Sequence, residues 1–258
     1  MSDDTTRKAA TLAILFISIA VNGAANVLPI NGQTTASISD RFAVYVVPAG
    51  YVFAIWGLIY LGQVAFAIDQ AIASGGRLAV FRRIGWLPAL AATLNAAWIL
   101  AWHYEVFSAT VAIMAGLLVT LIAIHRRLRA ADAAGEIDPR ARWTTRIPYS
   151  VYLGWITVAT IANVAAVLQW AGFDGFGIAG EVWAVAVLLT GLAIATAFVV
   201  RERDAAYGLV IVWAYAGIAV KESGVLPVAI VTGAGAIWIA GLAAWTVVQR
   251  RRGSFASA

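Results

Sequence analysis

The residues of this chain best suited to bind a small molecule are tryptophans and asparagines that stand inside long apolar segments. Trp56, Trp98 and Trp155 fall toward the interiors of such segments, and so do Asn95 and Asn163. A buried indole N–H needs an acceptor within the protein, and a buried asparagine that joins two helices contributes about 1 kcal/mol. Together these residue types describe an apolar pocket with a few polar contacts, the usual form of a small-molecule site. Helix packing alone is the alternative interpretation.

The remaining polar residues indicate neither a catalytic nor a metal-binding constellation. Asn22 and Asn26 lie four residues apart, so they share one face of a helix, but neither is charged. The two histidines, His103 and His125, belong to opposite ends of neighbouring apolar segments, about a bilayer thickness apart, so they cannot share a metal ion. No carboxylate pair lies within an apolar segment, which argues against a proton relay, and the absence of cysteine excludes disulfides and thiolate ligands.

Apolar segments of membrane-spanning length must position these residues. The chain is 62% hydrophobic and only 12% charged, with a mean hydropathy of +0.84, which a soluble domain of 258 residues would not sustain. A bilayer core of about 30 Å needs roughly 20 apolar residues per helix, and the segments lack the two-residue alternation of a barrel. The sequence therefore predicts an all-α membrane protein of about eight transmembrane helices, near residues 9–29, 49–70, 86–103, 105–124, 147–169, 180–200, 206–221 and 226–248.

The basic residues predict the orientation of these helices. The net charge is +5, and nearly every cluster of arginine falls after an even-numbered segment or before the first one, whereas the opposite connections carry only Arg41 and Lys221. The positive-inside rule then puts both termini in the cytoplasm of a multi-pass protein of the plasma (inner) membrane. We expect the arginines to orient the protein and contact anionic membrane lipid, with no nucleic acid as a partner.

Three connections are long enough to contribute to a site. Residues 30–47 are rich in serine and threonine and are the best candidate for a lid, with a mobile tether as the alternative. Residues 125–146 mix acidic residues with arginines, which is typical of a solvated short helix and turn. Residues 170–180 (WAGFDGFGIAG) are glycine-rich and aromatic, and we expect them on the external side.

Three motifs follow one another along the first two thirds of the chain. Residues 48–60 read PAGYVFAIWGLIY, close to the pattern P-x-G-W-x-F-G-P-x-W-x-x-L-Y, with Tyr51 in the tryptophan position and one residue fewer between Phe53 and Trp56. Residues 94–98 read LNAAW, matching L-N-x-x-W. A Pro-Tyr pair precedes WITVATIAN at residues 155–163, matching W-x-[ST]-x-A-x-x-x-N with about three extra residues between the halves.

Over residues 9–170 the chain thereby resembles the TspO family, the tryptophan-rich sensory proteins, also called translocator proteins or peripheral benzodiazepine receptors. The resemblance implies a five-helix bundle at residues 1–170, leaving a three-helix membrane extension at 171–258. It also implies a cavity, lidded by the loop between the first two helices, that takes porphyrins, haem precursors, sterols or synthetic aromatic ligands. The positions that match the family's ligand contacts are Tyr51, Phe53, Trp56, Asn95, Trp98, Trp155 and Asn163.

The resemblance and the residues together predict a membrane protein that binds a hydrophobic aromatic or tetrapyrrole ligand and acts as a sensor, regulator or carrier. No cofactor is required, and a porphyrin or haem precursor is expected as a ligand only. A homodimer is one expected assembly. The alternatives are a small-molecule transporter, a membrane enzyme that degrades a tetrapyrrole in light, and a structural subunit whose tryptophans only pack. The sequence does not decide whether the protein is an enzyme.

Overall fold

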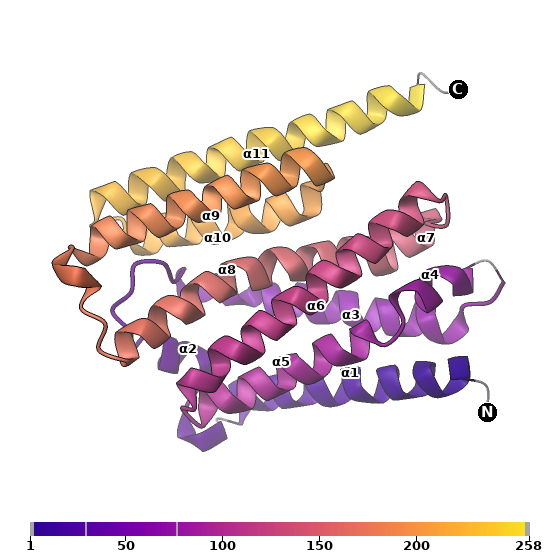
Figure 1. Ribbon diagram of the computed structural model, residues 1–258, viewed down its shortest axis with the longest axis horizontal. Coiled ribbons are helices and arrows are strands. Elements are labelled where there is room, and N and C mark those ends of the chain that lie inside the picture. Colours follow the sequence, from indigo (N-terminus) through magenta and orange to yellow (C-terminus); the bar gives the residue numbers. More distant parts are fainter. Residues whose placement is uncertain (1–2, 29, 76, 256–258) are drawn as a thin grey trace. The chain divides into compact units, whose positions relative to one another are not determined.

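The computed structural model describes residues 3–28, 30–75 and 77–255, and these residues form helices joined by short connections, without a β-strand among them (Figure 1). Each predicted span coincides with a helix, which confirms an all-α polytopic membrane protein. The long helices are α1 (Asp3–Val27), α3 (Ile55–Ile72), α5 (Leu87–His103), α6 (Phe107–Ala133), α8 (Ile147–Trp170), α9 (Gly180–Glu202), α10 (Ala205–Lys221) and α11 (Leu226–Phe255). The short ones are η1 (Ile30–Gly32), α2 (Thr35–Ser39), η2 (Gly50–Ala54), α4 (Arg77–Ile84), α7 (Pro139–Ala141), η3 (Arg142–Arg146) and η4 (Gly175–Gly177).

Six of the helical segments are long and apolar enough to cross a membrane, and a seventh span is formed if α4 and α5 act as one bent pair. The bend between these two helices is 48°, and it falls where Gly85 has a φ of +57° and Pro88 stands in the first turn of α5. Helix α10 has 17 residues and is shorter than an ordinary span. The count of eight crossings therefore stays a prediction.

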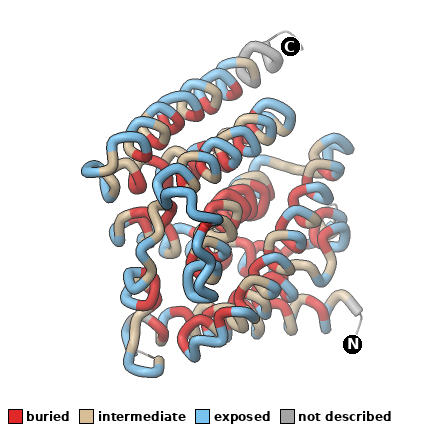
Figure 2. The backbone as a smooth tube through the Cα atoms, turned by 60° about the vertical axis from the view of Figure 1, so that its left-hand side comes forward, coloured by how far each residue is buried: buried red, intermediate tan, exposed pale blue. Residues whose placement is uncertain are grey.

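Large aliphatic side chains are exposed along the middle of the helices. Leu61 in α3 is 67% exposed, Val119 in α6 is 65% exposed and Ile237 in α11 is 76% exposed. Such surfaces are unfavourable in water, but lipid chains solvate them. Buried residues occupy the helix faces that meet neighbouring helices (Figure 2).

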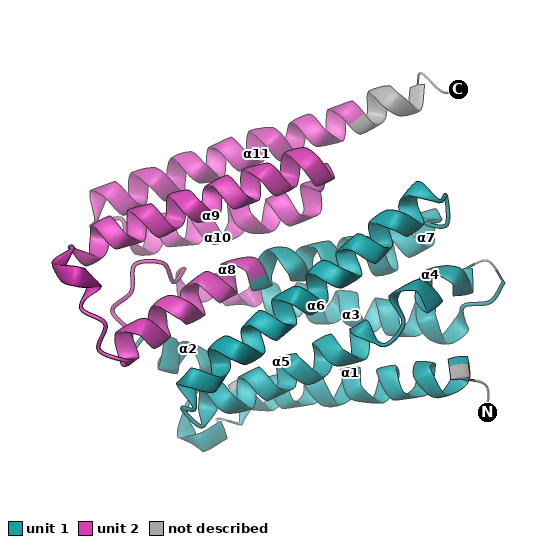
Figure 3. Cartoon of the chain, viewed as in Figure 1, with its two compact units in different colours: residues 1–41, 55–156 teal, residues 42–54, 157–258 magenta. Residues whose placement is uncertain are grey.

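The chain divides into two compact units (Figure 3). The first unit comprises residues 1–41 and 55–156, and the second comprises residues 42–54 and 157–258, so the boundary falls within α8. These units are defined by the packing of the chain. The division expected at residue 170 instead separates the part that resembles the TspO family from the three-helix extension, and it stays a prediction.

In the first unit, α1 packs against α3 and α5, and α5 packs against α6. Helix α3 approaches α8 closely at Gly62, where a Cβ atom would lie 2.8 Å from Cβ of Pro148. Next to this contact, the ring of Phe66 lies 5.8 Å from that of Phe81 and 5.2 Å from that of Tyr149, and all three side chains are buried. This aromatic cluster joins α3, α4 and α8.

One carboxylate of the first unit is entirely buried. Asp69 in α3 is 0% exposed, and its Oδ1 lies 2.9 Å from a guanidinium nitrogen of Arg77 and 2.7 Å from Nε of Arg140. Thr144 donates a hydrogen bond to Oδ2 at 2.6 Å. The end of α3 is thereby tied to α4 and to the chain that enters α8, because a buried carboxylate needs such partners.

In the second unit, α11 packs against α9 and α10. The Tyr215 hydroxyl of α10 donates to the Leu188 carbonyl of α9 at 2.7 Å, and Asp204 caps α10 by accepting from the Tyr207 amide at 3.1 Å. The indole of Trp213 donates to the Val52 carbonyl at 3.0 Å, which fixes η2 on α10.

Replacing Asp69 with asparagine should lower the thermal unfolding temperature of the detergent-purified protein. Two arginines would lose the negative charge that they face, but both reach solvent, so we expect a loss of roughly 2 kcal/mol, below the cost for a fully buried pair. The matched control is Asp4→Asn: the Asp4 carboxylate, which pairs with Arg7 and Arg82, is 24% exposed, so its loss should change stability by less than about 1 kcal/mol. Unfolding on heating is followed by tryptophan fluorescence. Equal shifts of the unfolding temperature in the two variants would show that Asp69 is not a structural anchor.

Candidate functional site

Three helices of the first unit bring polar side chains together in its interior. Asn22 Nδ2 in α1 donates to Asn95 Oδ1 in α5 at 2.7 Å, and Asn95 Nδ2 donates to the Tyr152 hydroxyl in α8 at 2.6 Å. Asn22 Nδ2 also donates to the Ser18 carbonyl at 2.8 Å. We call Asn22, Asn95 and Tyr152 the polar centre; all three are buried. The side chain of Asn26 lies outside the described part of the structure.

Aromatic rings flank the polar centre on one side. The Trp56 ring stacks on that of Tyr60 at 5.4 Å, and it meets Tyr152 at 6.0 Å and Trp155 at 6.2 Å in edge-to-face arrangements. Two of the predicted tryptophans therefore lie together, and Tyr152 joins them to Asn95. Sequence reasoning missed Tyr152. Its position three residues before Trp155, on the same helix face, was the available signal.

A buried amide beside the polar centre lacks one hydrogen bond. Gln63 Oε1 accepts from the Tyr149 hydroxyl at 3.2 Å, but Gln63 Nε2 is buried without a partner among the described residues. Gln63, Asn95 and Tyr60 line a cavity of about 10 Å³, which is room for one water molecule at most. An unsatisfied buried donor costs about 1 to 3 kcal/mol, so this position favours an acceptor atom from water or a ligand.

The remaining predicted residue of the first unit, Trp98, follows Asn95 by three residues on α5. Its ring stacks on that of Trp102 at 5.4 Å, nearly parallel at 18°. Trp98 thus extends the same helix face from the polar centre toward the end of α5.

The other three predicted residues belong to the second unit. Tyr51 is half exposed and meets Trp213 edge-to-face at 5.4 Å, while Phe53 is half-buried within η2. Asn163 is buried in α8. Within the first unit, the structure therefore brings together Trp56, Asn95 and Trp155, with Trp98 on the adjoining turn.

The first part of the predicted lid is folded onto the end of α5. Thr34 caps α2 through a reciprocal pair of hydrogen bonds with Ser37. The His103 ring of α5 contacts two polar groups of residues 30–41. Its Nε2 lies 3.1 Å from Thr35 Oγ1, and its Nδ1 lies 3.1 Å from the Ile30 carbonyl oxygen. Residues 30–41 are therefore held by side-chain contacts, as an ordered cover requires and a mobile tether does not.

Glu105 forms a second attachment for the same segment. Its carboxylate accepts from Gln33 Nε2 at 2.9 Å and lies 3.0 Å from a guanidinium nitrogen of Arg41. Glu105 itself has a φ of +60°, in the left-handed region that few non-glycine residues adopt. The hydrogen bond from Gln33 and the bond and charge of Arg41 hold the pKa of Glu105 below its ordinary value of 4.5.

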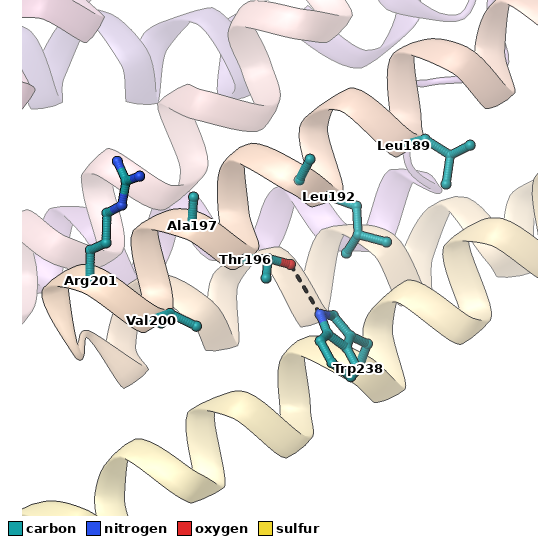
Figure 4. A pocket seen from close by; sticks show the side chains of 8 residues that line it. Leu189, Leu192, Thr196, Ala197, Val200, Arg201 and Trp238 are labelled. Atoms are coloured by element: carbon teal, nitrogen blue, oxygen red, sulfur yellow. Dashed lines mark hydrogen bonds between the residues drawn. The ribbon is translucent and has the colours of Figure 1, made fainter.

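A wide groove on the second unit runs between α9 and α11 (Figure 4). Its volume is about 580 Å³, and Trp238 Nε1 donates to Thr196 Oγ1 at 3.0 Å across it. Most of the groove is aliphatic, from Leu189 to Val200, with Arg201 at one end. Because the groove is open along the apolar face of both helices, lipid chains would fill it in a bilayer.

The fold and the polar centre together define a class: polytopic helical membrane proteins whose bundle interior holds asparagine amides beside tryptophan rings. The family model described as TSPO-like protein matches residues 8–245, and the chain belongs to this family. The match confirms the resemblance in the motifs and continues through α9, α10 and most of α11. Neither a curated protein nor a solved structure matches the chain.

Acidification should loosen the attachment of residues 30–41 to Glu105. The pKa of Glu105 is depressed in the folded protein. Its contribution to the stability of this attachment is therefore present above pH 4.5 and is lost as the pH falls below that value. The chain has no cysteine, so an Ala36→Cys variant accepts a single nitroxide label on α2. Its spectrum should show greater mobility below pH 4.5, and Glu105→Gln should show that mobility already at pH 7. An unchanged spectrum for Glu105→Gln at pH 7 would rule out this attachment.

Proposed function

We propose that the protein binds a hydrophobic aromatic or tetrapyrrole ligand at the polar centre and its flanking rings, and acts as a sensor, regulator or carrier. The observation that carries the proposal is the Asn95 amide, hydrogen-bonded at both ends beside Trp56 and Trp155. Membership of the TSPO-like family supports it. Indole and phenol rings stack on a flat ligand, and amides bond to its polar edge.

Binding at this position requires side chains to move. The cavity of about 10 Å³ is far below the roughly 300 to 1,000 Å³ of small-molecule pockets. The side chains able to open it are Trp56 and Tyr60, whose stacking costs about 0.5 to 1.5 kcal/mol to break. A ligand ring that replaces one partner of the stack recovers most of that energy. The donor of Gln63 would then gain an acceptor on the ligand.

The other residues of the proposed site and the membrane in which the protein lies are inferred from the sequence. The family resemblance implies that Tyr51, Phe53, Trp98 and Asn163 are ligand contacts as well. The arginine clusters support a location in the plasma membrane with both termini in the cytoplasm and with anionic lipid next to the protein. The proposal requires no cofactor, and it is compatible with a homodimer.

The test is a titration of the detergent-purified protein with protoporphyrin IX, followed at the Soret band. We expect a saturable shift for the wild type. Asn95→Leu removes two hydrogen bonds and should weaken binding roughly five- to twentyfold, and Trp56→Phe should weaken it by a smaller factor. Trp143→Phe is the control, because Trp143 is 70% exposed in η3 and should bind like the wild type.

Two results would contradict the proposal. One is a shift that does not saturate and is identical in all four proteins, since this is what partitioning into micelles produces. The other is a saturable shift of equal affinity in the wild type and Asn95→Leu, which would remove the polar centre from the site.

A further inference from the structure

The second unit contains a pocket that none of the motifs includes. It has a volume of about 410 Å³ and lies among residues 43–46, the end of α8 and the start of α9. We call it the α8–α9 pocket, and the lining side chains that matter here are Tyr45, Leu168, Gln169, Phe173, Asp174 and Trp183. The volume is within the range of small-molecule pockets, roughly 300 to 1,000 Å³.

The glycine-rich connection between α8 and α9 builds one wall of this pocket. Gly172, Gly175 and Gly177 have φ values of +75°, +68° and +73°, and they coil the chain tightly around η4. Trp183 Nε1 donates to the Gly175 carbonyl at 2.8 Å, and a Cβ atom at Gly175 would lie only 2.9 Å from that nitrogen. The Trp183 ring is therefore fixed against the connection.

Aromatic and apolar groups form the bed of the pocket. The ring of Phe173 lies 6.1 Å from that of Trp183 in an edge-to-face arrangement, and Tyr45 contributes a third ring. Leu168 and Val187 complete an apolar lining from α8 and α9. Three rings around one space present π-faces or edges to whatever binds there.

The one charged side chain among the lining residues of the pocket is a carboxylate, that of Asp174. Asp174 uses Oδ1 to accept from the Phe176 amide at 2.9 Å, and the described residues give its other oxygen no hydrogen bond. The Tyr45 hydroxyl and the Gln169 amide also have no hydrogen-bond partner in the described part of the chain. Glu181 lies in the first turn of α9, and residues 147–200 contain no lysine, arginine or histidine.

We propose that the α8–α9 pocket binds lipophilic organic cations, such as a quaternary ammonium or phosphonium with an aromatic body. The carboxylate of Asp174 attracts the charge, and the rings of Tyr45, Phe173 and Trp183 stabilise it by cation–π contact. The negative charge of Asp174 disfavours anions, including a porphyrin with carboxylate side chains. No lining residue of this pocket belongs to the polar centre, so this proposal stands or falls independently of the proposed function.

The experiment is equilibrium dialysis of tritiated tetraphenylphosphonium against the full chain in nanodiscs of uncharged phosphatidylcholine. The wild type should show saturable binding, and Asp174→Asn should weaken it about fivefold, since the asparagine keeps the cap on η4 but removes the charge. Gly175→Ala should also weaken binding by displacing Trp183. Glu222→Gln is the matched control: it removes one negative charge outside the pocket and should bind like the wild type.

A neutral probe of similar shape, triphenylphosphine oxide, should show no saturable binding. The thermal unfolding temperature establishes that Asp174→Asn is folded. Absence of saturable phosphonium binding in the wild type would overturn the inference, and so would equal affinity in Asp174→Asn. Failure of porphyrin binding with phosphonium binding intact would refute only the proposed function.

Discussion

The first unit depends on a chain of hydrogen bonds from Asn22 through Asn95 to Tyr152. Where no water is available, each of these polar groups must find its partner in the protein, so the three side chains fix how α1, α5 and α8 meet. The same groups are the polar atoms that a ligand would need. Under the proposed function, structure and binding would draw on one set of donors and acceptors, and a ligand would have to offer hydrogen bonds at least as good as those it replaces.

Polar and charged contacts hold the two ends of this unit. At one end, Asp69 gathers two arginines and a threonine, and at the other, His103 and Glu105 hold the segment from η1 to α2. Between them, the rings around Trp56 are joined by stacking and edge contacts, and Gln63 keeps an unsatisfied donor. In the middle of the unit, the rings rather than the hydrogen-bonded asparagines are thus the side chains that rearrange at low cost, which suits the opening that the proposed function requires.

Much of this architecture could be predicted from local sequence. Hydropathy located every long helix, and the motifs selected Trp56, Asn95 and Trp155, which do lie together. The partners could not be predicted, because the contacts of Asn22 and Tyr152 with Asn95 cross 73 and 57 residues of chain. The burial of Asp69 also escaped prediction, since a carboxylate near a span end is equally compatible with solvent. The α8–α9 pocket depends on glycine conformations that a composition reveals only as a glycine-rich loop.

The most direct test of the account is a double-mutant cycle on porphyrin affinity with Asn95→Leu, Tyr152→Phe and the double variant. If the polar centre acts as one unit, the double variant should bind about as weakly as the weaker single variant, giving a coupling energy of roughly 0.5 kcal/mol or more. Additive losses would mean that Asn95 and Tyr152 act separately. The absence of saturable binding in the wild type would contradict the assignment of a ligand site to the polar centre.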